Sequence, residues 1–110
     1  MKISTSMLLL SLACSGAHAN GFTDGNMLQQ WSRGSGDVAT DIVNTSLFIG
    51  YVRGVADTGD GVLFCIRNNV TVGQCVAVAE KYLENNPEKW NHEAAPLVIA
   101  ALQQAFPCGK

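Results

Sequence analysis

Apolar residues recur every three or four positions along most of the chain after residue 20, which is the spacing of helices with one buried face. No stretch of any length alternates apolar and polar residues as a strand does. The first predicted helix begins after Thr23 or Asp24, whose side chains can accept hydrogen bonds from its free amides, and it stops at Gly34-Ser35-Gly36. Its shared apolar face consists of Met27, Leu28 and Trp31.

The second predicted helix covers residues 38–57 and carries apolar side chains on two sides. One set consists of Val38, Ile42, Ile49, Val52 and Ala56, and the other of Leu47, Phe48, Tyr51 and Val55. A helix that is apolar on two sides lies either in the centre of a fold or at an interface. The pattern alone leaves both positions open.

Two further helices complete the chain. Thr71-x-x-Gln74 is a capping box that opens a third helix, and Asn85-Asn86-Pro87 ends it. Its repeating apolar positions are Val72, Cys75, Val76, Ala79, Tyr82 and Leu83. The last helix runs from about Glu93 to Ala105, with Pro96 in its first turn and an inward face of Leu97, Val98, Ala101, Leu102 and Ala105. The sequence therefore predicts an all-α fold, a small single-domain bundle of about four helices stapled by one disulfide.

The segment "ADTGDGVLFCIRNN" interrupts the helical pattern. Gly59 and Gly61, together with Asp57 and Asp60, supply turn chemistry for an exposed loop, and the apolar Val62-Leu63-Phe64 then returns to the core. This loop is the best candidate for a functional segment, and a plain connection between two helices is the equal alternative.

Residues 1–19 have the three parts of a secretory signal peptide. Lys2 supplies the positive charge, "MLLLSLAC" the short apolar region, and Ala17-His18-Ala19 the cleavage site. The apolar run is shorter than the roughly 20 residues that a membrane span needs, so we expect an exported, soluble protein that begins at Asn20. A lipoprotein anchored through Cys14 is a weaker alternative, because Ser11 stands where a lipobox has a leucine-like residue.

Removal of residues 1–19 leaves 91 residues, which is enough for one small domain. Lys2 is the only charged residue in the removed segment, so six basic residues face nine acidic ones and the formal net charge becomes −3. This charge disfavours a nucleic acid or an anionic membrane as the partner, and it suits a basic partner better.

Three cysteines remain after export, Cys65, Cys75 and Cys108. An odd number in an oxidising compartment is most simply one disulfide and one free thiol. A Cys65–Cys108 bond would fasten the end of the chain back across two helices, which the chain-entropy model values at about 4 kcal/mol. Cys75 lies in a helical apolar pattern typical of a buried thiol, and a Cys75–Cys108 bond stays open as the alternative.

The chain offers little catalytic equipment. Cys75 and His92 are the only pair for a Cys/His mechanism, and a thiol on a core face has a raised pKa and little thiolate. Asp57-x-x-Asp60-Gly61 lacks the alternating oxygen ligands and the distal Glu of a calcium loop. We therefore expect a binding protein without catalysis, cofactor or metal.

Four stretches of the chain resemble one family of bacterial proteins. They are "DGNMLQQW", "FIGYVRGVADT", "FCIRNNVTVGQCVAVAEKYLENNPE" and "APLVIAALQQAFPC", and together they cover nearly all of residues 20–110. In their order and spacing they resemble the Rap1a/Tai immunity proteins, which sit in the periplasm and inhibit peptidoglycan amidase effectors delivered by type VI secretion. The resemblance implies a Rap1a/Tai-like immunity domain over residues 20–110 with the same role.

The resemblance also bears on the cysteines. Cys65 and Cys108 match the family's F-C and F-P-C cysteines, which implies that these two pair. Family members often carry a second pair, whose places here look like Ser32 and either Leu47 or Phe48. Both partners of that second bridge are therefore missing.

The resemblance implies a dimeric inhibitor that blocks a Cys/His amidase by placing a loop in its active-site cleft. The toxin-binding residues expected on this basis are Asp57, Thr58, Gly59, Asp60 and Gly61. Leu47, Phe48 and Tyr51 would supply the dimer surface, and burial within one domain is the alternative for them. A periplasmic helical chaperone or stress protein is the alternative function, and such a protein should expose apolar surface when acidified.

Overall fold

The computed structural model describes residues 21–109, and the predicted signal peptide lies outside this range. In chain order the elements are the helices α1 (Gly25–Ser32), α2 (Val38–Gly59), α3 (Val72–Asn85), the short 3-10 helix η1 (Pro87–Lys89) and α4 (Ala94–Ala105). Residues 21–109 contain no strand, and one disulfide joins Cys65 to Cys108. The predicted all-α bundle of about four helices with one disulfide is confirmed.

The helices begin at the polar residues that the sequence indicates. The Asp24 side chain accepts a hydrogen bond from the amide of Met27 at 2.9 Å and caps α1. Thr71 and Gln74 form the predicted capping box of α3, because each side chain bonds the backbone amide of the other residue. Asp37 caps α2 in the same way as Asp24 caps α1.

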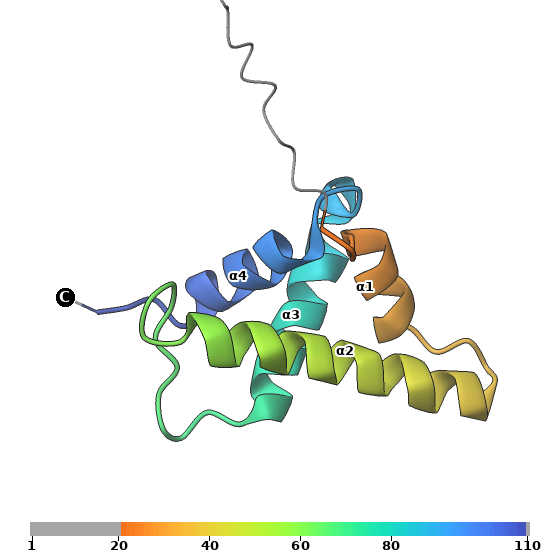
Figure 1. The fold of residues 1–110 in the computed structure, drawn as a ribbon, viewed down its shortest axis with the longest axis horizontal. Helices are drawn as coiled ribbons and strands as arrows, with labels where there is room; N and C mark the ends of the chain where they lie inside the picture. Colours follow the sequence, from red (N-terminus) through yellow and green to blue (C-terminus); the bar gives the residue numbers. More distant parts are fainter. Residues whose placement is uncertain (1–20, 110) are drawn as a thin grey trace, which may run out of the picture.

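Helix α2 is the longest element; α3 and α4 pack along its carboxyl-terminal half, and α1 packs nearer its middle (Figure 1). The first turns of α2 extend beyond α1 toward one end of the molecule (Figure 1). The core is assembled from all four α-helices and the segment after α2. Its largest fully buried side chains are Phe48, Phe64, Leu28, Leu102, Val52 and Val98.

Two positions expected on inward faces are exposed instead. Val72 is the first residue of α3 and Ala105 the last residue of α4, so both lie at helix ends where the bundle covers less surface. The end of the second helix was also predicted too early. Helix α2 continues to Gly59, where the amide of Asp60 still donates to the carbonyl of Ala56 at 3.0 Å.

Within residues 21–109, none of the helices combines the length and the apolar composition that crossing a bilayer requires.

Candidate functional site

The predicted functional loop is a tight turn that follows the end of α2. We call residues 57–64 the docking turn. Asp57, Thr58 and Gly59 belong to the last turn of α2, so the loop between the helices is shorter than the sequence predicts. The chain reverses at Gly61, whose φ of 79° is a conformation that L side chains rarely adopt, and the amide of Gly61 donates to the Phe64 carbonyl at 2.8 Å.

Phe64 anchors the docking turn in the core. Its side chain is 0% exposed and its ring lies directly against Gly59. A Cβ atom at position 59 would come within 2.7 Å of two ring carbons of Phe64, so glycine is required there for close approach. Of the three apolar residues expected to return to the core, only Phe64 does so.

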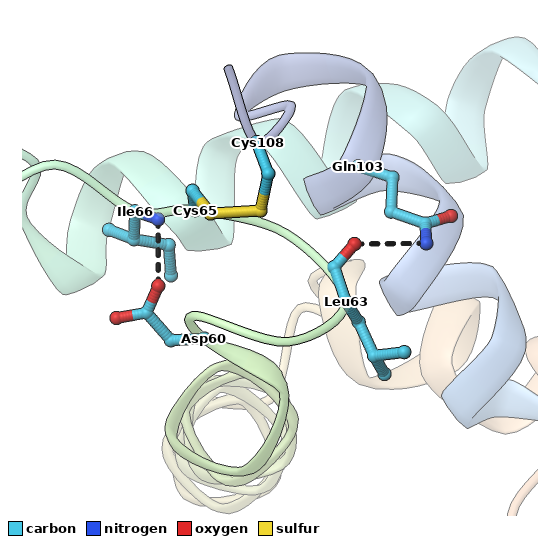
Figure 2. The surroundings of a disulfide bond; sticks show 6 residues. All are labelled: Asp60, Leu63, Cys65, Ile66, Gln103 and Cys108. Carbon is cyan, nitrogen blue, oxygen red and sulfur yellow. Dashed lines mark hydrogen bonds between the residues drawn. A yellow bond between two sulfur atoms is a disulfide. The ribbon is translucent and has the colours of Figure 1, made fainter. Parts of the chain in front are cut away.

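Three side-chain and covalent links join the turn and the residues after it to one another, to α4 and to the end of the chain. Figure 2 shows the Leu63 carbonyl accepting a hydrogen bond from Nε2 of Gln103 in α4 at 3.0 Å. In the same view Oδ1 of Asp60 accepts from the amide of Ile66 at 2.8 Å, and Cys65 is bonded to Cys108. These links restrain the turn at both of its sides.

The tip of the turn is apolar and its flank is acidic. Val62 is 81% exposed and Leu63 is 44% exposed. The side chain of Asp57 on the flank is 77% exposed and lies 4.0 Å from Nε of Arg53. An ion pair this open to water contributes little stability, so the carboxylate of Asp57 is available to another molecule.

A shallow apolar groove lies beside the turn, between α2 and α4. Its volume is about 410 Å³, and Leu63 connects it to the tip of the turn. Its lining contains no charged side chain and consists of Gly50, Tyr51, Gly54, Val55, Thr58, Gly59, Leu63, Ala95 and Ile99. The turn and the groove together form one continuous surface that is mostly uncharged.

The structure does not bring Cys75 and His92 together. Cys75 is the fourth residue of α3, whereas His92 comes after the last residue of that helix, Asn85. About 15 Å of helix lies between Cys75 and Asn85. Cys75 is buried and outside any disulfide, and burial, with a smaller effect of the Asp60 charge, raises the pKa of its thiol. Within residues 21–109, no three His, Cys, Asp or Glu side chains are grouped to hold a metal ion.

The three residues expected at a dimer surface lie in different environments. Leu47 is 45% exposed, Tyr51 is half-buried beside the groove, and Phe48 is 1% exposed in the core of its own chain. Phe48 faces inward because it belongs to the buried core that α2 forms with the helices packed against it, α1, α3 and α4. Phe48 is therefore not part of the exposed surface.

Sequence reasoning named Leu47 but did not single out the other exposed apolar residues in the first half of α2. We call its amino-terminal half, residues 38–49, the α2 arm. The large apolar side chains that the arm exposes are Val38, Ile42, Val43, Leu47 and Ile49. The sequence signal for this exposed surface was the double apolar pattern of the second helix, because a small core cannot cover both apolar sides of one helix.

No curated protein gives a significant match to this chain. The family model of the Rap1a immunity proteins matches residues 15–108, which include the four α-helices, the docking turn and both cysteines of the disulfide. The chain therefore belongs to the Rap1a immunity protein family.

Proposed function

We propose that this protein is a periplasmic immunity protein that binds and inhibits a peptidoglycan amidase effector of a type VI secretion system. Family membership carries the proposal. The signal peptide of residues 1–19 would export the domain of residues 20–110 to the compartment where such an amidase acts. The protein would need no catalysis of its own, since a tightly bound inhibitor only has to cover the active site.

The docking turn is the segment proposed to enter the amidase. It protrudes at Val62 and it is held by Phe64, Gln103 and the disulfide, so little conformational entropy is lost on binding. Asp57 and Asp60 place negative charge beside the tip, which would suit the catalytic histidine of a Cys/His amidase.

Inhibition of a purified enzyme tests the function. The oxidised chain from Asn20 to Lys110 is titrated into type VI peptidoglycan amidases, above all one encoded by an adjacent gene, and muropeptide cleavage is followed. Near-stoichiometric inhibition of one amidase is expected. A folded protein that leaves the adjacent-gene amidase fully active would overturn the proposal.

A matched pair of charge reversals tests the docking turn separately. Asp57→Lys changes the flank of the turn, and Glu88→Lys makes the same change of charge in η1, at an exposed position far along the chain. We expect Asp57→Lys to weaken inhibition by at least about tenfold and Glu88→Lys to leave it unchanged. Equal inhibition by the two variants would reject the turn as the contact and keep the function.

We propose that the α2 arm forms a homodimer surface, in which Leu47 takes part and Tyr51 lies at the edge. The support is the run of exposed apolar side chains on one helix, which is unusual for a monomer. Sedimentation should show a dimer that Leu47→Asp dissociates. Val62→Asp introduces the same charge on an exposed residue outside the arm and should leave the dimer intact.

A further inference from the structure

The connection between the docking turn and α3, residues 65–70, is held by few contacts. The amide of Cys65 donates to the carbonyl of Phe106 at 2.8 Å, and the amide of Ile66 donates to Asp60. The side chains of Ile66 and Val70 are partly buried, whereas residues 67–69 are exposed. A segment with so few apolar contacts opens more readily than the helices around it.

The chain end that meets this connection is held no more firmly. After α4, Phe106 packs partly against the core, and Pro107, Cys108 and Gly109 are exposed. The Cys65–Cys108 bond joins the two segments with their Cα atoms 4.8 Å apart, although 43 residues separate them in the sequence. The covalent link therefore lies where non-covalent contacts are sparse.

The connection also covers the free thiol. Cys75 is 4% exposed and lies under a hollow of about 260 Å³. Ile66 and Val70 from the connection line this hollow together with Asp57 and Asp60 from the end of α2. Movement of the connection away from α3 would uncover the thiol and remove the Ile66 amide from the Asp60 carboxylate.

We infer that the Cys65–Cys108 disulfide is a redox-sensitive clasp that keeps the connection closed over Cys75 and keeps Asp60 in place within the docking turn. A dithiol reductant opens the clasp: it donates two electrons and two protons, its own two thiols become a disulfide, and the Sγ–Sγ bond of the protein becomes two thiols. The connection then opens locally while the helices stay folded. Its effect on amidase docking rests on the proposed function, whereas the clasp itself does not.

Alkylation of Cys75 tests the clasp. The full exported chain is treated with iodoacetamide, oxidised or after reduction by dithiothreitol; the thiolate displaces iodide to form a carbon–sulfur bond, and peptide masses report each cysteine separately. We expect reduction to speed alkylation of Cys75 by at least about tenfold. An unchanged rate would overturn the inference.

Global unfolding would also expose Cys75, so amide hydrogen exchange is measured on the same samples. The alkylation rate of Cys75 gives the population of molecules in which the thiol is exposed, and the slowest-exchanging amides of the helices give the population that is globally unfolded. If opening is local, the first population is larger than the second in the reduced protein. Equal open populations would mean that Cys75 reacts only from the unfolded chain, and they would overturn the clasp.

A variant separates the clasp from the other tether of the turn. Gln103→Ala removes the hydrogen bond to Leu63 and leaves the disulfide, so Cys75 should alkylate at the rate of the oxidised wild type. Cys108→Ser should reproduce the fast rate of the reduced protein without reductant. If Gln103→Ala gives the fast rate as well, the disulfide is not the specific control.

Amidase inhibition by the two redox states distinguishes the regulatory consequence from the proposed function. Reduction is expected to weaken inhibition by at least about tenfold, because the Asp60 side of the docking turn loosens. Equal inhibition by both states would reject the regulatory consequence. Absence of inhibition in both states would reject the proposed function, and the alkylation rates would still decide the clasp.

Discussion

The two ends of α2 differ in what holds them. At the carboxyl-terminal end, Gly59 lies against the buried ring of Phe64, and the turn beyond it is tied to α4 through Gln103. At the amino-terminal end, the α2 arm exposes large apolar side chains, with Val38 74% exposed and Ile42 62% exposed. The rest of the chain thus covers one end of α2 and leaves the other end exposed.

Under the proposed function, the two ends would serve two kinds of binding. A turn that is ordered by its own chain can meet a partner at low entropic cost, which suits tight inhibition. An exposed apolar helix face gains most of its stabilisation by covering apolar area, which suits association with another copy. Substitutions at the two ends should therefore act on different properties, the folding free energy at one end and assembly at the other.

Phe64→Ala should have the largest effect on the anchored end. Phe64 is fully buried, so its truncation leaves a cavity between α2 and the turn and should lower the free energy of unfolding by about 3–5 kcal/mol. Val62→Ala, two residues away and mostly exposed, should change it by less than about 0.5 kcal/mol. Urea denaturation of both variants measures the two values, and similar values would contradict the anchoring role of Phe64.

Cys108→Ser should have the next largest effect. Loss of the disulfide frees the chain end and removes a constraint over 43 residues of the unfolded chain, so we expect a loss of about 2–5 kcal/mol. Comparison of the variant with the oxidised wild type in urea gives this value. Cys75→Ser is the control for the loss of a cysteine outside the disulfide. Its mass should show that the disulfide is still formed.

Two glycines of α2 offer a smaller and sharper comparison. Gly59→Ala forces a methyl group against the ring of Phe64 and should cost about 1–3 kcal/mol. Gly54→Ala adds the same methyl group where no atom lies within 4 Å, so the better helix propensity of alanine should stabilise the protein by about 0.5–1 kcal/mol. Thermal unfolding should therefore move in opposite directions, and shifts of the same sign would contradict the packing described for Gly59.

Much of the fold was predictable because its signals are local. The capping box of Thr71 and Gln74, the cap at Asp24 and the helix stop at Asn85-Asn86-Pro87 each depend on neighbours in the sequence. The pairing of Cys65 with Cys108 was preferred on topology and on the family resemblance, and the structure contains it.

The candidate site was harder to predict because it depends on contacts between distant segments. Gly59, the last residue of α2, lies against the ring of Phe64, and no local pattern in the sequence predicts that contact. Phe48 and Leu47 are adjacent apolar residues of one helix, yet the first is buried and the second exposed. Which of them faces inward is decided by where the other three α-helices pack on α2, since the apolar pattern of α2 marks two sides and does not distinguish between them.

Loss of a helix cap should have the smallest effect on stability. The effect should also differ between the α2 arm and a helix packed in the bundle. Thr71→Ala removes the cap of α3 and should lower the free energy of unfolding by about 1 kcal/mol. Asp37→Ala removes the cap of the arm, whose first turn is exposed, so the loss should appear mainly as faster amide exchange in that turn, with a smaller change in global stability.

Acid should reproduce the Asp37 substitution. Hydrogen bonds from the side chain and then the amide of Thr40 lower the pKa of Asp37, so the cap is present above its unfolded pKa and is lost as the pH falls through the lowered value. Protection of the first turn, taken relative to the intrinsic exchange rate at each pH, should then fall in the wild type until it no longer differs from that of Asp37→Ala. Strong protection of this turn in Asp37→Ala at neutral pH would mean that the arm is held from outside its own helix, as a homodimer through the arm requires.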